Sequence, residues 1–304
     1  MSPSLTVGLP SFGSPPGGDW RGLVDLARMA EDAGVDRVVI SDHVVLGPNL
    51  DAYPWGRFPT PADAPWLEPL TVLTAMAAVT TSIRLSTGIL IAPLRPAALL
   101  AKTVATIDVL SGGRLDLGVG TGWQPEEYTA EGLDFADRGR LLTDTIAACR
   151  ALWERLPADF DSPSLSFEQI SCSPQPARRV PIWFAGGLHP RNVDRILTLG
   201  DGWIPHPGAG VETVAEGVVR LRDALTSAGR DPASVAVQGS PGFARDADGR
   251  PDLAATLERV PALMAAGATD VNLNLRLFCA DPAEAPAVLR AMVAGFADAK
   301  GRTP

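Results

Sequence analysis

The sequence predicts an α/β fold, and within that class a (β/α)8 TIM barrel with loop insertions. Three observations predict it. Eight short apolar segments are each followed by a segment of helical periodicity, no linker or repeat interrupts the alternation, and 304 residues with 46 % hydrophobic content suit one barrel. We therefore expect residues 1–304 to form a single barrel domain. An open doubly wound sheet, which shows the same alternation, is the main alternative.

The N-terminal half supplies four strand–helix pairs. The strands are expected at residues 5–9, 37–40, 83–90 and 114–120. The helices are expected at residues 20–33, 68–81, 95–110 and 136–156. Asp19 is a suitable N-cap for the first of these helices, and Gly34 is a suitable residue to end it.

The C-terminal half continues the alternation with shorter strands. These are expected at residues 180–185, 202–204, 234–239 and 269–275, with helices at residues 190–199, 211–228, 253–266 and 282–297. Residues 157–181 are poor in helix formers, and Phe160, Leu165 and Phe167 indicate a small hairpin insertion there.

Charge and cysteine content exclude several classes of protein. The net charge of −9 argues against nucleic acid as a partner. No run of 18 apolar residues is present, and the N-terminus has no signal-peptide pattern, so no membrane partner is expected. Cys149, Cys172 and Cys279 are odd in number and lack metal-ligand spacing, which favours the reducing cytoplasm and no metal site.

One stretch carries the strongest local signal. Residues 114–119 alternate as a strand does, and the chain then breaks at a Gly-Thr-Gly turn followed by Trp123. Such a strand end offers a flat ligand close approach to the backbone. The alternative is an ordinary tight turn in which Trp123 covers the core. Pro125, followed by Glu126 and Glu127, marks a helix start with acids in its first turn.

In a barrel, the carboxyl ends of the strands share one face, and the site lies there. Four strand ends should therefore line one cleft, and they carry Ser41, Asp42 and His43; Ser86, Thr87 and Gly88; Gly120, Thr121, Gly122 and Trp123; and Gly186 with Gly187.

His43 is the expected chemical group of this cleft. Its imidazole can donate to a ligand carbonyl or transfer a proton near neutral pH. Asp42 beside it either orients the imidazole or bonds to the ligand. His189 and His206 are expected to be bystanders. Gly186 and Gly187 precede a helix start and so suit a phosphate, although an ordinary turn has the same pattern.

Residues 44–67 form a long loop without periodicity, and long loops of this kind are usually functional. Tyr53, Trp55, Phe58 and Trp66 give this loop its aromatic character. Two interpretations remain open: a hydrophobic cluster under the loop, or the lining of a pocket for an apolar substrate.

The motifs at the strand ends resemble those of the luciferase-like monooxygenase superfamily, over residues 5 to about 298. The matching stretches are residues 40–43 (ISDH), 83–89 (IRLSTGI), 110–123 (LSGGRLDLGVGTGW) and 182–187 (IWFAGG). Within the superfamily, the chain looks most like the actinobacterial oxidoreductases that use the deazaflavin coenzyme F420. The resemblance implies a bacterial luciferase-like TIM barrel.

The resemblance also implies positions for the cofactor. Asp42 and His43 match residues beside the deazaflavin ring, and Thr87 and Gly88 match a bulge behind it, where relatives have a non-proline cis peptide. The remaining matches are Gly120, Thr121, Gly122 and Trp123 along the cofactor, and Gly186, Gly187 and Leu188 at its phosphate. Tyr53, Trp55 and Trp66 are the expected substrate-binding residues.

The activity that follows is hydride transfer between coenzyme F420 and a small organic substrate, with His43 as the acid–base group and Glu126 and Glu127 as weaker proton-transfer candidates. Two alternatives remain: an FMN-dependent monooxygenase supplied by a partner reductase, and a non-catalytic flavin-binding barrel. The resemblance and the apolar content also predict a homodimer.

Glucose 6-phosphate is not expected to be the substrate. The sugar-phosphate dehydrogenases of this class carry a tryptophan four residues after the histidine, where this chain has Gly47. They also hold the sugar phosphate with lysines, and neither Lys102 nor Lys300 falls at the carboxyl end of an expected strand.

Overall fold

Parallel strands pair into one closed ring, as the sequence predicts. The computed structural model describes residues 3–302. Within them the ring runs β1 (Ser4–Gly8), β2 (Arg37–Ile40), β3 (Arg84–Thr87), β5 (Leu115–Gly120), β8 (Ile182–Ala185), β9 (Gly202–Ile204), β10 (Ala236–Gly239) and β13 (Asp270–Asn274), which pairs with β1. The pairing of β3 with β5 closes the ring, so the fold is a barrel and not an open sheet.

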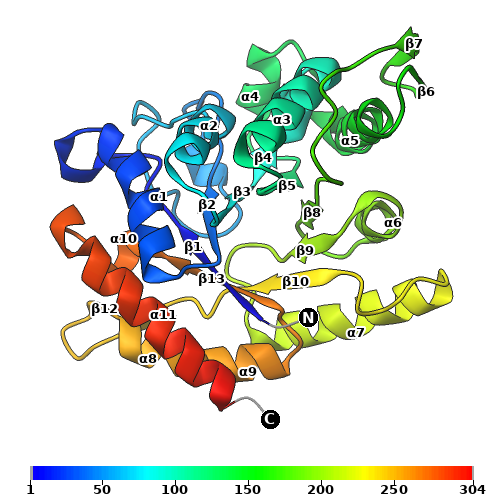
Figure 1. The fold of residues 1–304 in the computed structure, drawn as a ribbon. Helices are drawn as coiled ribbons and strands as arrows, with labels where there is room; N and C mark the ends of the chain where they lie inside the picture. The colour runs from blue at the N-terminus through cyan, green and yellow to red at the C-terminus, as the bar shows by residue number, and fades with distance from the viewer. Residues whose placement is uncertain (1–2, 303–304) are drawn as a thin grey trace.

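Helices surround the ring on its outside (Figure 1). They are α1 (Arg21–Ala33), α2 (Pro69–Val79), α3 (Ala97–Ser111), α5 (Arg138–Glu154), α6 (Pro190–Leu199), α7 (Val211–Ser227), α8 (Leu253–Leu257), α9 (Val260–Ala265) and α11 (Ala285–Gly301). The hydrophobic core lies between this layer and the strands, and Leu115, Leu117 and Val119 of β5 are completely buried in it. No helix of the described chain is both long and apolar enough to cross a membrane.

Most helix ends follow the local signals. Gly34 ends α1 with a left-handed φ of 89°, as expected of a C-terminal glycine. Asp19 is one residue too early to be the N-cap of α1, because the helix starts at Arg21. Its carboxylate still accepts a hydrogen bond from the Arg21 N–H at 2.9 Å.

The expected strand 83–90 is divided. It forms β3 and then β4 (Leu90–Ile91), which pairs with β5, and the Gly88–Ile89 peptide bond between them is cis, at the bulge that the resemblance implied. A side chain at position 88 would overlap Val39 of β2, so glycine allows this close crossing.

The prediction of one helix over residues 253–266 was wrong. Two short helices, α8 and α9, replace it, because Pro261 has no N–H to continue the helical hydrogen bonds. Several short elements were not predicted. They include a small hairpin of β11 (Ala244–Arg245) and β12 (Pro251–Asp252), the short α10 (Leu275–Phe278), and the 3-10 turn η5 (Pro282–Glu284) at the start of the last predicted helix. The predicted insertion is present as β6 (Ala158–Asp161) and β7 (Ser166–Ile170).

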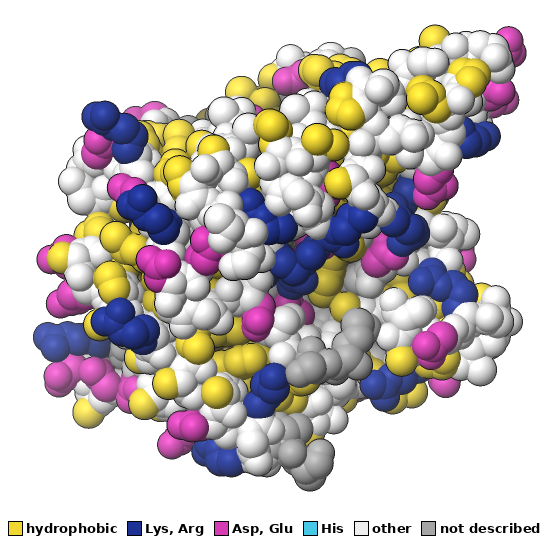
Figure 2. Space-filling model, viewed as in Figure 1, with side chains coloured by type: hydrophobic (Ala, Val, Ile, Leu, Met, Phe, Trp, Pro, Cys, Tyr) yellow, Lys and Arg dark blue, Asp and Glu magenta, His cyan; other side chains and the backbone are white. Residues whose placement is uncertain are grey.

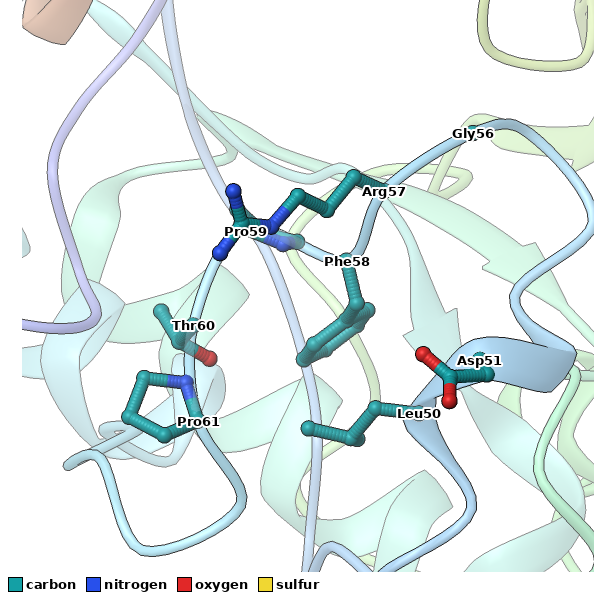
Figure 3. Close-up of a pocket in the computed structure, with 8 residues that line it drawn as sticks. All are labelled: Leu50, Asp51, Gly56, Arg57, Phe58, Pro59, Thr60 and Pro61. Atoms are coloured by element: carbon teal, nitrogen blue, oxygen red, sulfur yellow. The ribbon is translucent and has the colours of Figure 1, made fainter.

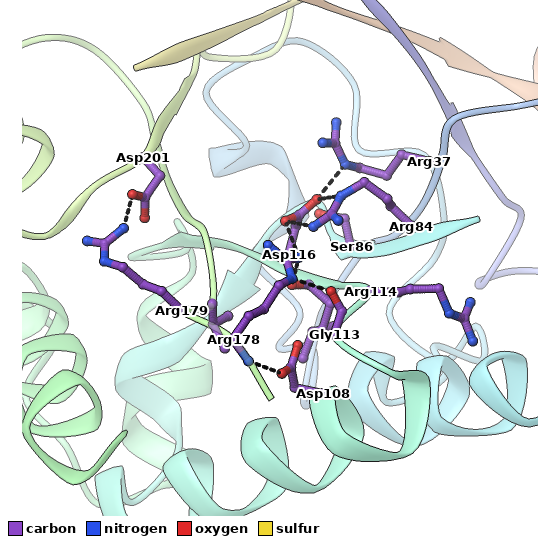
Figure 4. A network of polar contacts seen from close by, with 12 residues as sticks. Arg37, Arg84, Ser86, Asp108, Gly113, Arg114, Asp116, Arg178, Arg179 and Asp201 are labelled. Atoms are coloured by element: carbon purple, nitrogen blue, oxygen red, sulfur yellow. Dashed lines mark hydrogen bonds and ion pairs between the residues drawn. The ribbon is translucent and has the colours of Figure 1, made fainter. Parts of the chain in front are cut away.

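A buried ion-pair network fills the amino-terminal end of the barrel (Figure 4). Asp116, 1 % exposed, accepts from Arg37 Nε at 2.9 Å and from Arg84 Nε at 2.7 Å. Arg37 also pairs with Asp270, whose carboxylate accepts from Thr6 Oγ1 at 2.8 Å. Burial lowers the pKa of Arg37, but the two carboxylates outweigh it and raise that pKa overall.

Candidate active site

His43 lies at the carboxyl end of β2 and pairs with a buried acid. Its Nδ1 is 3.1 Å from Glu127 Oε2, with side-chain exposures of 9 % and 0 %. The second oxygen of Glu127 accepts the Val44 N–H at 3.0 Å. Because a carboxylate only accepts hydrogen bonds, it fixes the proton on Nδ1 and leaves Nε2 for a ligand. Among residues 3–302, Nε2 has no hydrogen-bond partner.

Glu127 reaches His43 from the turn after β5. It belongs to the short helix α4 (Pro125–Ala130), whose first turn is acidic as expected. His43 and Glu127 are 84 residues apart in the sequence, so no local pattern predicted that they would pair. The result is a carboxylate–imidazole dyad, an arrangement that holds an acid–base group in one tautomer and stabilises its protonated form.

Asp42, next to His43, is fully engaged with protein groups. Its carboxylate accepts from Arg95 at 2.7 and 3.0 Å and from the Ile91 N–H at 2.8 Å, and its side chain is 0 % exposed. Arg95 also bonds to Glu68 at 2.9 Å. Burial lowers the pKa of Arg95, but Asp42 and Glu68 outweigh it and raise that pKa. Asp42 therefore stabilises the backbone next to His43. It does so partly through Arg95, which the sequence analysis did not identify.

Aromatic side chains cover His43. The ring of Trp66 lies 4.7 Å from the imidazole, that of Phe58 5.3 Å and that of Trp123 6.2 Å. Tyr53 packs 5.2 Å from Trp123 and 5.3 Å from Phe58. We call Tyr53, Phe58, Trp66 and Trp123 the aromatic cover. Trp123 thus faces His43 and the loop and does not cover the core.

The loop of residues 44–67 contributes most of this cover. Its start is held to the β5 side by two hydrogen bonds between the Gln124 amide and the Gly47 backbone, of 2.9 and 3.2 Å. Farther along, Trp66 donates to Thr60 at 3.2 Å and stacks 4.0 Å from Phe12. Trp55 lies at the edge, 41 % exposed. The loop aromatics therefore form a hydrophobic cluster, as one interpretation expected. This cluster also covers His43, the candidate catalytic group, so it lines the region that the other interpretation assigned to a pocket.

The same loop encloses a cavity of about 840 Å³ (Figure 3). Its walls are Leu50, Asp51, Gly56, Arg57, Phe58, Pro59, Thr60 and Pro61. Phe58 belongs both to these walls and to the aromatic cover. Phe58 therefore links the cavity to the surroundings of His43, and the volume falls within the range of small-molecule pockets.

The Gly120–Gly122 turn is less open than expected. A side chain at position 120 would come within 2.9 Å of Ile89 Cδ1, and one at 122 within 3.1 Å of Ile91. The glycines thus let β3 and β4 pack closely on β5. Thr87 joins the same strands, since its Oγ1 donates to the Gly118 carbonyl at 2.7 Å. The Thr121 carbonyl accepts from the Tyr128 hydroxyl at 2.6 Å.

Two polar atoms after this turn have no partner. The indole Nε1 of Trp123 and the Oε2 oxygen of Glu126 are buried without a hydrogen bond. No contact joins Glu126 to His43, so the structure brings only one of the two candidate acids to the histidine. Buried polar atoms without partners are rare in proteins, and they often indicate a missing ligand or water.

The turn after β8 is open to an anion. Gly186 has a φ of 104°, and a side chain at exposed Gly187 would meet no atom within 4 Å. In the described chain the N–H groups of Gly187 and Leu188 have no partner. Asn192 holds the turn by donating to the carbonyls of Ala185 and Gly187 at 3.3 and 3.1 Å. Free N–H groups at the start of the ten-residue α6 fit a phosphate.

Three arginines lie near enough to affect His189, which follows that turn. Burial lowers the pKa of His189, and the guanidinium groups of Arg195, Arg191 and Arg220 lower it further. His189, expected to be a bystander, is the N-cap of α6 and accepts from the Asn192 N–H. The local charge is positive, as an anion site requires.

No group of three or more potential metal ligands is found among residues 3–302. The three cysteines are free thiols. The segments that follow β2, β5 and β8 therefore carry a histidine–carboxylate dyad, part of an aromatic cover and an anion turn.

Comparison with known proteins identifies the family of this chain. The family model described as luciferase-like monooxygenase matches residues 5–248. An F420-dependent glucose-6-phosphate dehydrogenase of Nocardia farcinica is 32 % identical over 223 residues, which cover 71 % of this chain and 62 % of that protein.

Two solved structures share the fold at low sequence identity. An F420-dependent secondary alcohol dehydrogenase, bound to an F420–acetone adduct, has a TM-score of 0.75 at 17 % identity, covering 97 % of this chain and 99 % of that one. The FMN-bound oxygenating constituent of 3,6-diketocamphane monooxygenase from Pseudomonas putida has a TM-score of 0.73 at 16 % identity, covering 98 % and 99 %. With the family model matching most of its length, the chain belongs to the luciferase-like monooxygenase family.

Proposed function

We propose that this protein is an F420-dependent oxidoreductase that transfers a hydride between the deazaflavin and a small organic substrate. The His43–Glu127 dyad beneath the aromatic cover carries the proposal, because it places an oriented proton-transfer group in a site largely closed to water. Relatives named as F420-dependent enzymes support the choice of cofactor. When bound, the deazaflavin supplies a carbon that accepts or delivers the hydride, and its reduced form reacts poorly with oxygen.

Each group has a distinct role in this proposal. The N–H groups of Gly187 and Leu188 bind the cofactor phosphate. Thr87, Gly88 and residues 120–123 would hold the deazaflavin ring. His43 Nε2 takes the proton from a substrate hydroxyl as the hydride leaves the adjacent carbon, or returns it in the reverse direction. Glu127 stabilises the imidazolium that forms, and the aromatic cover excludes water.

An equilibrium titration with F420, FMN and FAD tests the cofactor. We expect F420 to bind at least about tenfold more tightly than either flavin. Tighter FMN binding, together with oxygen consumption in the presence of reduced FMN, would instead support the monooxygenase alternative, which the fold shared with an FMN-bound monooxygenase keeps open. Binding of a flavin without any turnover would support a non-catalytic barrel, against which the oriented dyad argues.

The substrate in this proposal is not glucose 6-phosphate. Gly47 occupies the position four residues after His43, and Glu126 fills the adjacent space. Lys102 lies in the middle of α3 and Lys300 in α11, so neither reaches the carboxyl ends of the strands.

We further propose a homodimer that forms through α2 and α3, which pack against each other. Leu99 and Leu110 of α3 are 62 % and 63 % exposed, and Val109 and Val79 add to the apolar surface. Light scattering should give twice 31.8 kDa at micromolar concentration, whereas a stable 31.8 kDa species would contradict the dimer.

A further inference from the structure

Glu126 occupies a place that only glycine at position 47 allows. A Cβ atom at Gly47 would lie 2.5 Å from Glu126 Cγ and 2.6 Å from its Cβ, so no side chain fits there unless Glu126 moves. The backbone of Gly47 is held in that position by Gln124. The start of the loop and the turn after β5 therefore jointly fix the position of the Glu126 side chain.

Two polar atoms at this corner lack partners, one acceptor and one donor. Glu126 Oε2, in the first turn of α4, and Trp123 Nε1, just before that helix, are both buried and without a hydrogen bond. Burying a polar atom without a partner is costly, whether it is a carboxylate oxygen or an N–H. Both costs disappear if a ligand provides a donor to Glu126 and an acceptor to Trp123. A hydroxyl group is the smallest group that does both.

The surroundings of the two atoms are apolar. Trp123 packs against Tyr53 at 5.2 Å and Phe58 at 5.4 Å, and Phe58 forms a wall of the loop cavity (Figure 3). His43 packs edge-on against Trp123, with ring centres 6.2 Å apart, and neither Trp123 Nε1 nor Glu126 Oε2 is hydrogen-bonded to it. We therefore treat the group bound by Glu126 and Trp123 as different from the group that reacts at His43.

We propose that Glu126 and Trp123 form a recognition site for a hydroxyl group on an apolar substrate, distinct from the reacting carbon, and that they reject carboxylates and phosphate esters. The inference rests on the proposed function only in taking the cleft at His43 as the substrate site. Glu126 thus selects the substrate, and Glu127 serves the proton transfer. The rejection of anions follows from the like charge of Glu126 in a site of low polarity.

The test uses three probes of similar size: benzyl alcohol, benzylamine and benzoate. Their binding to the full-length protein is measured by calorimetry, with and without F420. We expect wild type to bind benzyl alcohol at least about tenfold more tightly than benzoate. Glu126→Gln keeps the shape but removes the charge, so its benzoate affinity should rise by about tenfold. A misfolded variant cannot produce this gain.

Two further variants complete the design. Glu131→Gln, an exposed acid at the other end of α4, is the matched control and should bind all probes as wild type does. Trp123→Phe removes the indole N–H and should weaken benzyl alcohol severalfold more than benzylamine, which has no acceptor for it. Equal benzoate affinity in wild type and Glu126→Gln, or no binding of any probe to wild type, would overturn the proposal. A failure to bind F420, with the probe preferences intact, would count only against the proposed cofactor.

Discussion

The two ends of the barrel differ in whether their buried polar side chains find hydrogen-bond partners within the protein. At the amino-terminal end, Asp116 and Asp270 accept hydrogen bonds from Arg37 and neighbouring residues and are almost fully buried. Figure 2 shows basic side chains gathered around the central hollow of one face. At the carboxyl end, the mouth of the barrel, Trp123 Nε1 and Glu126 Oε2 are buried without partners. Asp108 Oδ1 and Arg150 Nε, toward the amino-terminal end, are also buried without partners, but the other polar atoms of both side chains are hydrogen-bonded within the protein. Glu126 and Trp123 have no side-chain hydrogen bond at all, which is the pattern expected where a ligand supplies the partner.

The largest expected effect is at the mouth. His43→Ala should lower the rate of hydride transfer by about 10²–10⁴, the usual contribution of a positioned acid–base group. Cofactor affinity should fall much less, because the anion turn at Gly187 is untouched. The measurement is single-turnover transfer on folded protein saturated with cofactor. A rate near that of wild type would show that His43 only packs or binds, and would direct the search for the proton-transfer group to Glu126, Glu127 or solvent.

The matching change at the other end should affect stability instead. Asp116→Ala leaves Arg37, only 9 % exposed, without one of its two carboxylates, and should lower the free energy of unfolding by about 3–5 kcal/mol. Chemical denaturation measures this loss. Asp137→Ala breaks an exposed pair with Arg140 and is the control, with an expected cost of about 0–1 kcal/mol. If folded Asp116→Ala protein lost turnover without losing stability, the amino-terminal network would contribute to activity, which would contradict this prediction.

A smaller effect is expected at the anion turn. Gly187→Glu places a carboxylate beside the free N–H groups, and should weaken cofactor binding by about ten- to a hundredfold through charge repulsion. Stability should change little, because Gly187 is exposed and an added Cβ meets no atom. Fluorescence titration measures the affinity, and wild-type binding by the variant would mean that the phosphate lies elsewhere.

The smallest effect concerns pH, at the turn that leads from α2 into β3. Burial raises the pKa of Glu31, but hydrogen bonds from the N–H groups of Ile83, Ser82 and Thr81 outweigh it and lower that pKa from 4.5 to about 2. A lowered folded-state pKa stabilises the protein above 4.5, and this stabilisation is lost as pH falls toward about 2. Glu31→Gln should therefore flatten the decline of the melting temperature in that window. An unchanged decline would show that other carboxylates control the acid sensitivity.

Much of the fold could be predicted from the sequence because its signals are local. The glycine after α1, the start of α6 at Pro190 and the strand alternation in β5 depend on neighbouring residues and on backbone conformation. The parallel barrel then follows from the repeated strand–helix order, which also places His43 at the mouth. Such signals were weaker where one proline divided a helical pattern, as Pro261 does in the first turn of α9.

The partners of the site residues depended on the tertiary structure. Asp42 is the sequence neighbour of His43, yet it pairs with Arg95, and the histidine pairs with Glu127 across 84 residues. The sequence determined which chemical groups reach the mouth, since each strand delivers the residues at its own end. Barrel closure decided which of them meet, because a side chain pairs with whatever another strand or loop brings within about 3 Å.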